Sequence, residues 1–149
     1  MPDHGPGRYV EYRHPIRVGP GAIDDLDHVN NAIYLMWMQE AVNAYWHKTA
    51  PPEQVETLAW IAHRHDVVYH RPAVLHDLIV AVVRVIGHQG CRAHFETRFE
   101  RNGEDVAIVE STLVCIDRGS RQLVRIRPDL AQHFYLRDTE ATTASGAMR

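Results

Sequence analysis

Residues 30–48 contain neither glycine nor proline and carry apolar side chains around most of a helical circumference. The apolar positions are Ile33, Leu35, Met36, Trp37, Met38, Ala41, Val42, Ala44, Tyr45 and Trp46. A helix that is apolar on nearly all sides must be covered on nearly all sides. The pattern therefore predicts a buried helix that begins at Asn30 or Asn31 and ends before the two prolines at 51 and 52.

The rest of the chain shows the two-residue alternation and the turn signals of β-strands. Strands are predicted over residues 8–18, 58–71, 78–87, 92–101 and 106–117. The Asn-Gly pair at 102–103 predicts a tight hairpin between the last two. A short strand within residues 122–127 and a helical turn within residues 128–134 are expected to follow.

These elements fit one α+β domain, because 149 residues are too few for two ordinary domains. A flat sheet would leave most of the apolar helix in water. We therefore expect one curved antiparallel sheet, of about five or six strands, wrapped around the helix. The domain is expected to span residues 1–137, and the small polar tail at 138–149 is expected to be disordered.

Composition argues against several classes of function. With 16 basic and 19 acidic residues the net charge is -3, without the basic face that nucleic-acid binding requires. No apolar run approaches the roughly 20 residues of a membrane span, and the first residues do not resemble a secretion signal. We therefore expect a cytoplasmic protein in which Cys91 and Cys115 are free thiols.

Histidine is frequent, with 11 residues, and His63 and His65 have the spacing that places two side chains on one face of a strand. That spacing suits metal ligation, but a solvated strand face explains it equally well. We expect neither a metal nor a cofactor.

The segment before the predicted helix is densely polar, with three aspartates, a histidine and two asparagines within residues 24–31. Asparagine favours the N-cap of a helix, and the N–H groups of the first turn have no partner inside the helix. These donors and the helix dipole bind anions, and they stabilise an oxyanion strongly where water is excluded. Asp24 lies six residues before Asn30 and can fold back over the same helix end. A carboxylate beside an oxyanion hole is the minimum equipment for acyl transfer.

The same residues form a motif of an aspartate, three residues, His-Val-Asn-Asn, two residues and a tyrosine. Its members are Asp24, His28, Val29, Asn30, Asn31 and Tyr34. In this motif the chain resembles the hotdog-fold acyl-CoA thioesterases of the 4-hydroxybenzoyl-CoA thioesterase superfamily, and it is similar to the plant acyl-ACP thioesterases. The resemblance includes a Tyr-x-x-Pro sequence at 69–72 and covers roughly residues 9–130. It implies a hotdog fold and hydrolysis of an acyl-CoA or acyl-carrier-protein thioester.

The resemblance also implies roles for single residues. The aspartate at position 24 acts in the family as nucleophile or as general base, and a backbone N–H at about Asn31 polarises the thioester carbonyl. A histidine matching His28 has a catalytic part in the plant enzymes, although a loop-ordering role fits it equally well. Asn30 and Tyr34 would lie beside the substrate, while Asn30 also suits a helix cap and Tyr34 also suits the core.

Three positions depart from the family pattern. Asp27 stands where a glycine usually precedes the histidine, His76 replaces the glycine of a common Gly-Asp turn, and Ala22 replaces a frequent aspartate. Asp27 alters the flexibility of the loop and adds a negative charge beside the site. Asp25, one residue from Asp24, becomes a rival for the catalytic role.

Two other functions fit the same fold. A hotdog enoyl hydratase would resemble an Asp-x-Asn-Pro-x-His pattern, which this chain lacks. A non-catalytic acyl-CoA binding or regulatory protein would keep the pocket but would not need Asp24.

The expected partners are an acyl-CoA or acyl-carrier-protein substrate and further copies of the chain, as a homodimer or homotetramer. Pairing of two subunits would cover an exposed strand edge on each, and substrate sites lie at subunit interfaces in the hotdog relatives. Because the CoA nucleotide is polyanionic, a few cationic side chains near the pocket must offset the net charge of -3. The candidates are Arg64 and Arg71, followed by Arg84 and Arg92.

Overall fold

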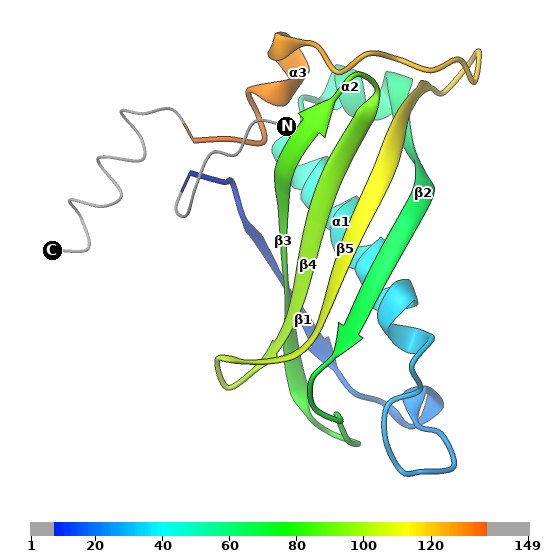
Figure 1. The fold of residues 1–149 in the computed structure, drawn as a ribbon, viewed down its shortest axis with the longest axis vertical. Coiled ribbons are helices and arrows are strands. Elements are labelled where there is room, and N and C mark those ends of the chain that lie inside the picture. The colour runs from blue at the N-terminus through cyan, green and yellow to red at the C-terminus, as the bar shows by residue number, and fades with distance from the viewer. Residues whose placement is uncertain (1–7, 137–149) are drawn as a thin grey trace, which may run out of the picture.

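The computed structural model describes residues 8–136, and in this range the chain forms a curved antiparallel sheet of five strands beside one long helix (Figure 1). The strands are β1 (Tyr12–Arg17), β2 (Leu58–Tyr69), β3 (Leu78–Gln89), β4 (Arg92–Arg101) and β5 (Glu104–Asp117). Their order in the sheet is β1-β3-β4-β5-β2, so β1 and β2 are its two edges. The predicted tail at 138–149 lies outside the described residues.

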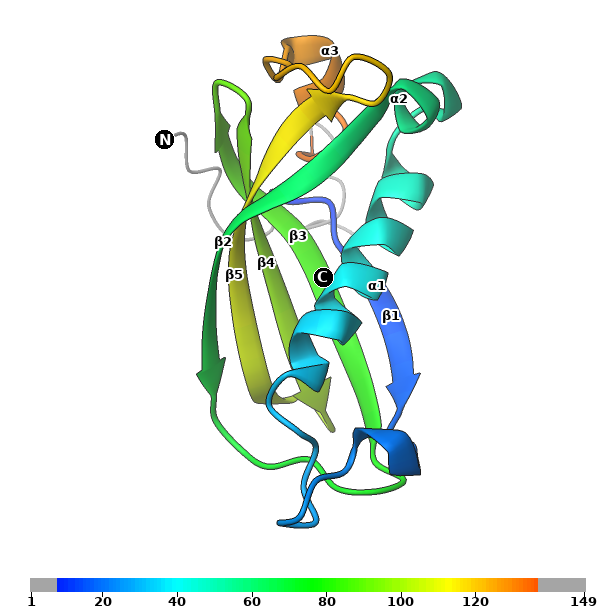
Figure 2. The same cartoon turned by 90° about the vertical axis from the view of Figure 1, so that its right-hand side faces the viewer.

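The long helix α1 (Ile33–Thr49) lies along one face of the sheet, as Figure 2 shows. Alternate residues of the central strands are buried against it, including Val83, Phe95 and Val109. The helix buries Tyr34, Trp37, Met38, Ala41, Val42, Tyr45 and Trp46. A curved sheet around one apolar helix is therefore confirmed, although Met36 on the outer side of the helix remains 57% exposed.

The helix begins at Ile33, two or three residues later than predicted. Asn30 explains the difference, because its Oδ1 accepts the N–H of Ala32 at 2.9 Å and its carbonyl accepts the N–H of Ile33 at 2.9 Å. The asparagine thus closes a turn of its own before the regular helix starts. Its side chain still satisfies a donor at the helix entrance, as a capping residue does.

Other boundaries also differ from the prediction. After α1 the proline pair opens a short helix, α2 (Pro52–Thr57), which fits the preference of proline for the first turn of a helix. The short strand predicted within residues 122–127 is reduced to a single bridge between Ile116 and Leu123. A helical turn follows as α3 (Pro128–Ala131), within the predicted range.

The turns follow the backbone preferences of their residues. Asn102 and Gly103 have φ angles of 54° and 79°, so both centres of the β4–β5 hairpin are left-handed, as a tight hairpin with Asn-Gly requires. In β2 the register against β5 shifts between Ala62 and Arg64, which leaves His63 without a partner on β5. This bulge interrupts the regular alternation that placed His63 and His65 on one face. No helix within residues 8–136 is long and apolar enough to cross a membrane.

Candidate active site

The loop before α1 folds back on itself as a small hairpin. The N–H of Asp24 donates to the carbonyl of His28 at 2.9 Å, and the N–H of Asn30 donates to the carbonyl of Ala22 at 2.8 Å. The tip is closed by the N–H of Asp27, which donates to the carbonyl of Asp24 at 3.0 Å. The hairpin therefore holds Asp24 directly across from His28, at the entrance to α1.

One oxygen of the Asp24 carboxylate is used within this loop. Asp24 Oδ1 accepts the N–H of Leu26 at 2.9 Å, the common local bond of a turn aspartate. Its second oxygen bonds to no residue within the described range. Asp25, by contrast, is exposed, and its side chain makes no hydrogen bond to any residue of the described range. The half-buried Asp24 is thus oriented by its turn and retains a free oxygen for chemistry.

Both positions where the family usually carries glycine have left-handed backbone here. Asp27 has a φ of 62° and His76 a φ of 74°. This region is strained for residues other than glycine, and aspartate and histidine are among those that tolerate it better. At both departures from the pattern a side chain is therefore held in a backbone region that favours glycine, which adds local strain.

A cavity of about 240 Å³ lies at the start of α1, between the Asp24 loop and the end of β2. It is lined by His28, Val29, Asn31, Tyr34, Tyr69, His70, Arg71 and Pro72. The structure thus brings together four predicted site residues, His28, Asn31, Tyr34 and Arg71. Asp24 does not line the cavity itself, but its N–H bonds the carbonyl of the cavity-lining His28. Asn30 and Arg64 do not line the cavity either.

Asn31 provides a free donor at this cavity. Its backbone N–H makes no hydrogen bond to any residue of the described range, whereas its carbonyl accepts the hydroxyl of Tyr69 at 3.0 Å. An unpaired N–H in the turn that leads into a helix is favourably placed for an anion. Tyr69 fixes the same peptide segment from the opposite wall and was not among the predicted site residues. The Tyr-x-x-Pro sequence was the signal that could have found it.

Tyr34 is a buried donor and not a base. Its side chain is 2% exposed, and its ring packs edge-on against Trp37, Tyr69 and Phe99 at 5.3 to 5.6 Å between centroids. Burial raises the pKa of Tyr34 to about 12, although nearby Arg101 acts in the opposite direction. The phenol is therefore neutral at physiological pH and serves as cavity wall.

The second wall of the cavity belongs to the loop between β2 and β3. Asp77 Oδ2 accepts the Nη1 of Arg101 at 2.6 Å and the N–H of Val74 at 2.9 Å. The same guanidinium atom donates to the carbonyl of Pro72 at 3.1 Å. Partial burial acts to raise the pKa of Asp77, but these hydrogen bonds outweigh it and the pKa lies below its usual value. The Asp77–Arg101 pair thus holds the loop that carries Arg71 and Pro72.

This geometry can be compared with known proteins. A family model described as the thioesterase-like superfamily matches residues 18–134. The chain belongs to this superfamily. It is similar to the long-chain acyl-CoA thioesterase FadM of Escherichia coli (strain K12), with 28% identity over 125 residues that cover 78% of this chain and 92% of FadM.

Solved structures agree with the family. The probable thioesterase YbaW from Escherichia coli shares 25% identity with a TM-score of 0.70, covering 81% of this chain and 94% of YbaW. A thioesterase from Thermus thermophilus, complexed with coenzyme A and Zn, shares 25% identity with a TM-score of 0.71, covering 82% of this chain and 90% of that protein. The predicted hotdog fold and the predicted thioester hydrolase are confirmed.

The thioesterase has a second and larger cavity, of about 520 Å³, between α1 and β2. The apolar pattern of residues 30–48 predicted a buried helix and did not predict this cavity as a separate feature. Its apolar lining consists of Met38, Val42, Trp46, Ala59, Trp60, Ala62 and Leu113. His65 lies in its wall, where Nδ1 bonds the Ser111 hydroxyl at 2.8 Å and burial lowers its pKa. His65 is therefore neutral near pH 7 and suits an apolar cavity.

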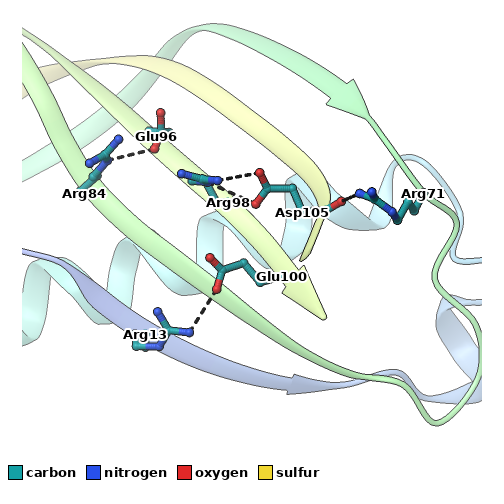
Figure 3. A network of polar contacts seen from close by, with 7 residues as sticks. All are labelled: Arg13, Arg71, Arg84, Glu96, Arg98, Glu100 and Asp105. Carbon is teal, nitrogen blue, oxygen red and sulfur yellow. Dashed lines mark hydrogen bonds and ion pairs between the residues drawn. The ribbon is translucent and has the colours of Figure 1, made fainter. Parts of the chain in front are cut away.

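Three of the arginines that were predicted to bind the CoA nucleotide form ion pairs with carboxylates of the same chain. Arg84 Nε bonds Glu96 at 2.9 Å, and Arg64 Nε lies 3.2 Å from Asp66. Arg71 Nε lies 3.2 Å from Glu104, and its Nη1 donates to the carbonyl of Asp105 at 2.7 Å. Figure 3 shows the contacts of Arg71 with Asp105 and of Arg84 with Glu96 within a network over the sheet face away from α1. Of these three, Arg71 is the one that lines the small cavity.

Proposed function

We propose that this protein hydrolyses acyl-CoA thioesters to a free acid and CoA, with Asp24 as nucleophile or general base and the Asn31 N–H as oxyanion donor. The observation that carries the proposal is the unpaired N–H of Asn31 in a cavity at the start of α1. A donor fixed by the backbone needs no reorganisation when charge develops on the thioester oxygen. The CoA complex of the Thermus relative and the name of the FadM relative support acyl-CoA as the substrate class.

Thioester chemistry makes modest demands on the site. A thiol with a pKa near ~8.5 leaves as thiolate without a strong general acid. Asp24 then has one task, which is either to attack the carbonyl and form an anhydride or to remove a proton from water. His28, which lines the cavity and is bonded through its carbonyl to the Asp24 N–H, positions this carboxylate against the bound thioester.

The length of the groove between α1 and β2 favours a long acyl chain. Tyr34 and Asn31 lie at the small cavity, whereas Met38, Val42 and Trp46 follow at four-residue spacing along one side of α1. Tyr34 at the small cavity and Trp46 in the larger one are twelve residues apart, about 18 Å along the helix axis, so the two cavities follow one another along α1. Trp46 and Trp60 line the larger cavity, and their rings meet edge to face at 5.5 Å between centroids. An extended aliphatic chain fits these dimensions better than a compact aromatic acyl group.

The functional unit is a homodimer formed through the β2 edge. β2 is an edge strand of 12 residues, and Ile61, Val68 and Tyr69 on it are 49%, 53% and 44% exposed. Long apolar edges of this kind are normally paired. Arg64 and Asp66 have opposite charges two residues apart, so a two-fold axis at His65 would set each Arg64 opposite the partner's Asp66. The half-exposed Met36 on α1 is a further apolar group that a second copy would cover.

The direct test is thiol release from a panel of acyl-CoAs, with acyl-carrier-protein thioesters of the same acyl groups in parallel. Hydrolysis with a preference for long acyl-CoA supports the proposal. Hydration of an enoyl-CoA, or tight acyl-CoA binding without turnover, would support one of the two alternative functions instead. The free thiols Cys91 and Cys115 agree with the predicted cytoplasmic setting, which itself stays a prediction.

A further inference from the structure

The larger cavity, between α1 and β2, has one polar side chain set back in its apolar wall. His65 lines the cavity, is half-buried and contacts Ser111, which is 3% exposed. Four other polar side chains line the cavity, but all of them are exposed and meet solvent at its rim. They are Gln39, Glu40, Asn43 and Arg118. A cavity for a plain hydrocarbon chain has no need of a polar pair in its inner wall.

The sheet holds this pair in place. His65 on β2 lies directly opposite Ser111 on β5, and its Nδ1 bonds the Ser111 hydroxyl at 2.8 Å. His65 makes no further hydrogen bond to any residue of the described range, so its Nε2 remains for a ligand. Burial lowers the pKa of His65, and the neutral ring offers Nε2 as donor or as acceptor according to its tautomer.

A plain aliphatic chain in the cavity would leave this nitrogen without a partner. A polar atom covered by apolar groups loses its hydration, and the loss disfavours a ligand that supplies no hydrogen bond in return. A hydroxyl suits either tautomer of the imidazole, because a hydroxyl both donates and accepts. The cavity therefore favours a hydrocarbon chain that carries one hydroxyl at the level of His65.

The position of His65 along β2 determines where this hydroxyl lies on the chain. Tyr69 marks the reacting end, since its hydroxyl donates to the carbonyl of Asn31 at 3.0 Å. His65 precedes Tyr69 by four residues on the same face of the strand, without a register shift between them, which corresponds to about 13 Å. The hydroxyl is thus in the middle of a long acyl chain and far from the thioester carbonyl.

We propose that the substrates are long-chain acyl-CoA thioesters with a mid-chain hydroxyl, and that His65, oriented by Ser111, recognises this hydroxyl through Nε2. The inference rests on the proposed function and narrows its substrate class. It gives His65 a role in specificity and none in cleavage of the thioester bond.

The first experiment compares ricinoleoyl-CoA with oleoyl-CoA, two substrates that differ by one mid-chain hydroxyl. The original protein should show a kcat/KM about tenfold higher for ricinoleoyl-CoA, the ratio expected for one hydrogen bond to a half-buried group. β-Hydroxypalmitoyl-CoA and palmitoyl-CoA form a second pair, in which the hydroxyl lies beside the thioester. This pair should be cleaved with nearly equal kcat/KM.

The second experiment changes the recognising residue. His65→Leu should abolish the preference for ricinoleoyl-CoA and raise kcat/KM for oleoyl-CoA, because no polar atom is then left without a partner. His65→Gln keeps a hydrogen-bonding group and should retain part of the preference, whereas Ser111→Ala should weaken it. His63→Leu is the matched control, since His63 is exposed at the bulge of β2 and does not line the cavity. Each readout is a ratio between two substrates, which a loss of stability alone would not change.

Equal cleavage of ricinoleoyl-CoA and oleoyl-CoA by the original protein would overturn the inference. This result is expected if a water molecule or the partner subunit's His65 satisfies Nε2. A ratio that survives His65→Leu, or a preference for β-hydroxypalmitoyl-CoA over palmitoyl-CoA, would overturn it as well. In each of these cases the original protein still hydrolyses acyl-CoA, whereas failure of the proposed function would leave all of these thioesters uncleaved.

Discussion

The N–H of Val29 donates to the carbonyl of Ala73 at 2.9 Å, which joins the loop before α1 directly to the loop between β2 and β3. The two walls of the cavity at the start of α1 are therefore connected through the backbone. The Asp77–Arg101 pair fixes the second loop and, through Val29, also supports the first.

Asp77→Asn should therefore destabilise the fold and loosen the site. It weakens a hydrogen bond of 2.6 Å to Arg101 at a carboxylate that is 19% exposed. We expect the free energy of unfolding to fall by about 1.5–3 kcal/mol in denaturant titration. Glu104→Gln is the control: its partner is also an arginine, but Glu104 is 68% exposed, so the change should stay within about 0.5 kcal/mol. Equal losses in both variants would contradict the support we assign to Asp77.

The same pair predicts a dependence of stability on pH. Because the pKa of Asp77 is lower in the folded protein, its contribution is complete above the unfolded pKa of about 4 and is lost as the pH falls through the folded value. The difference in unfolding free energy between the original protein and Asp77→Asn should thus be constant near neutrality and shrink below about pH 4. An increase of this difference in unfolding free energy below about pH 4 would contradict a lowered pKa of Asp77 in the folded protein.

Asp24→Asn should fold normally and lose thioesterase activity by about 100-fold or more in kcat. The amide keeps the oxygen that accepts the Leu26 N–H, so the turn is preserved while the base or nucleophile is lost. Asp25→Asn, one residue away and exposed, should change kcat only mildly. The reverse ranking of the two variants would move the catalytic role to Asp25.

The parts that the sequence predicted are those governed by local pattern. The apolar positions of α1 and the alternation in β3, β4 and β5 follow from residue spacing alone, and Asn102 with Gly103 identified a hairpin. The late start of α1 depended on whether the Asn30 side chain would close its own turn. The pairing of Arg64, Arg71 and Arg84 with carboxylates depended on cross-strand register, which spacing does not reveal. Spacing likewise does not reveal which arginines, such as Arg121, Arg125 and Arg127, have no ion-pair partner within the described residues.

The proposed homodimer should be sensitive to charge on the β2 edge. Val68 is 53% exposed on β2 in the single chain, and Val68→Lys would place two ammonium groups in the proposed interface. We expect light scattering to show a shift from dimer toward monomer at micromolar concentration. Leu78→Lys changes a residue of similar exposure at the start of β3, away from the β2 edge, and should leave the dimer intact. A monomeric original protein would contradict the proposed assembly.

Filling the groove between α1 and β2 should shorten the preferred acyl chain. Ala62 lines the larger cavity, and Ala62→Phe would occupy space that the far end of a long chain requires. We expect kcat/KM for palmitoyl-CoA to fall by at least about tenfold while that for octanoyl-CoA changes little, since each displaced methylene forfeits contacts in the cavity. Val114→Phe is the control, because Val114 follows the cavity-lining Leu113 on β5 and points to the other face of the sheet. Equal effects of Ala62→Phe on both substrates would place the acyl chain outside this groove.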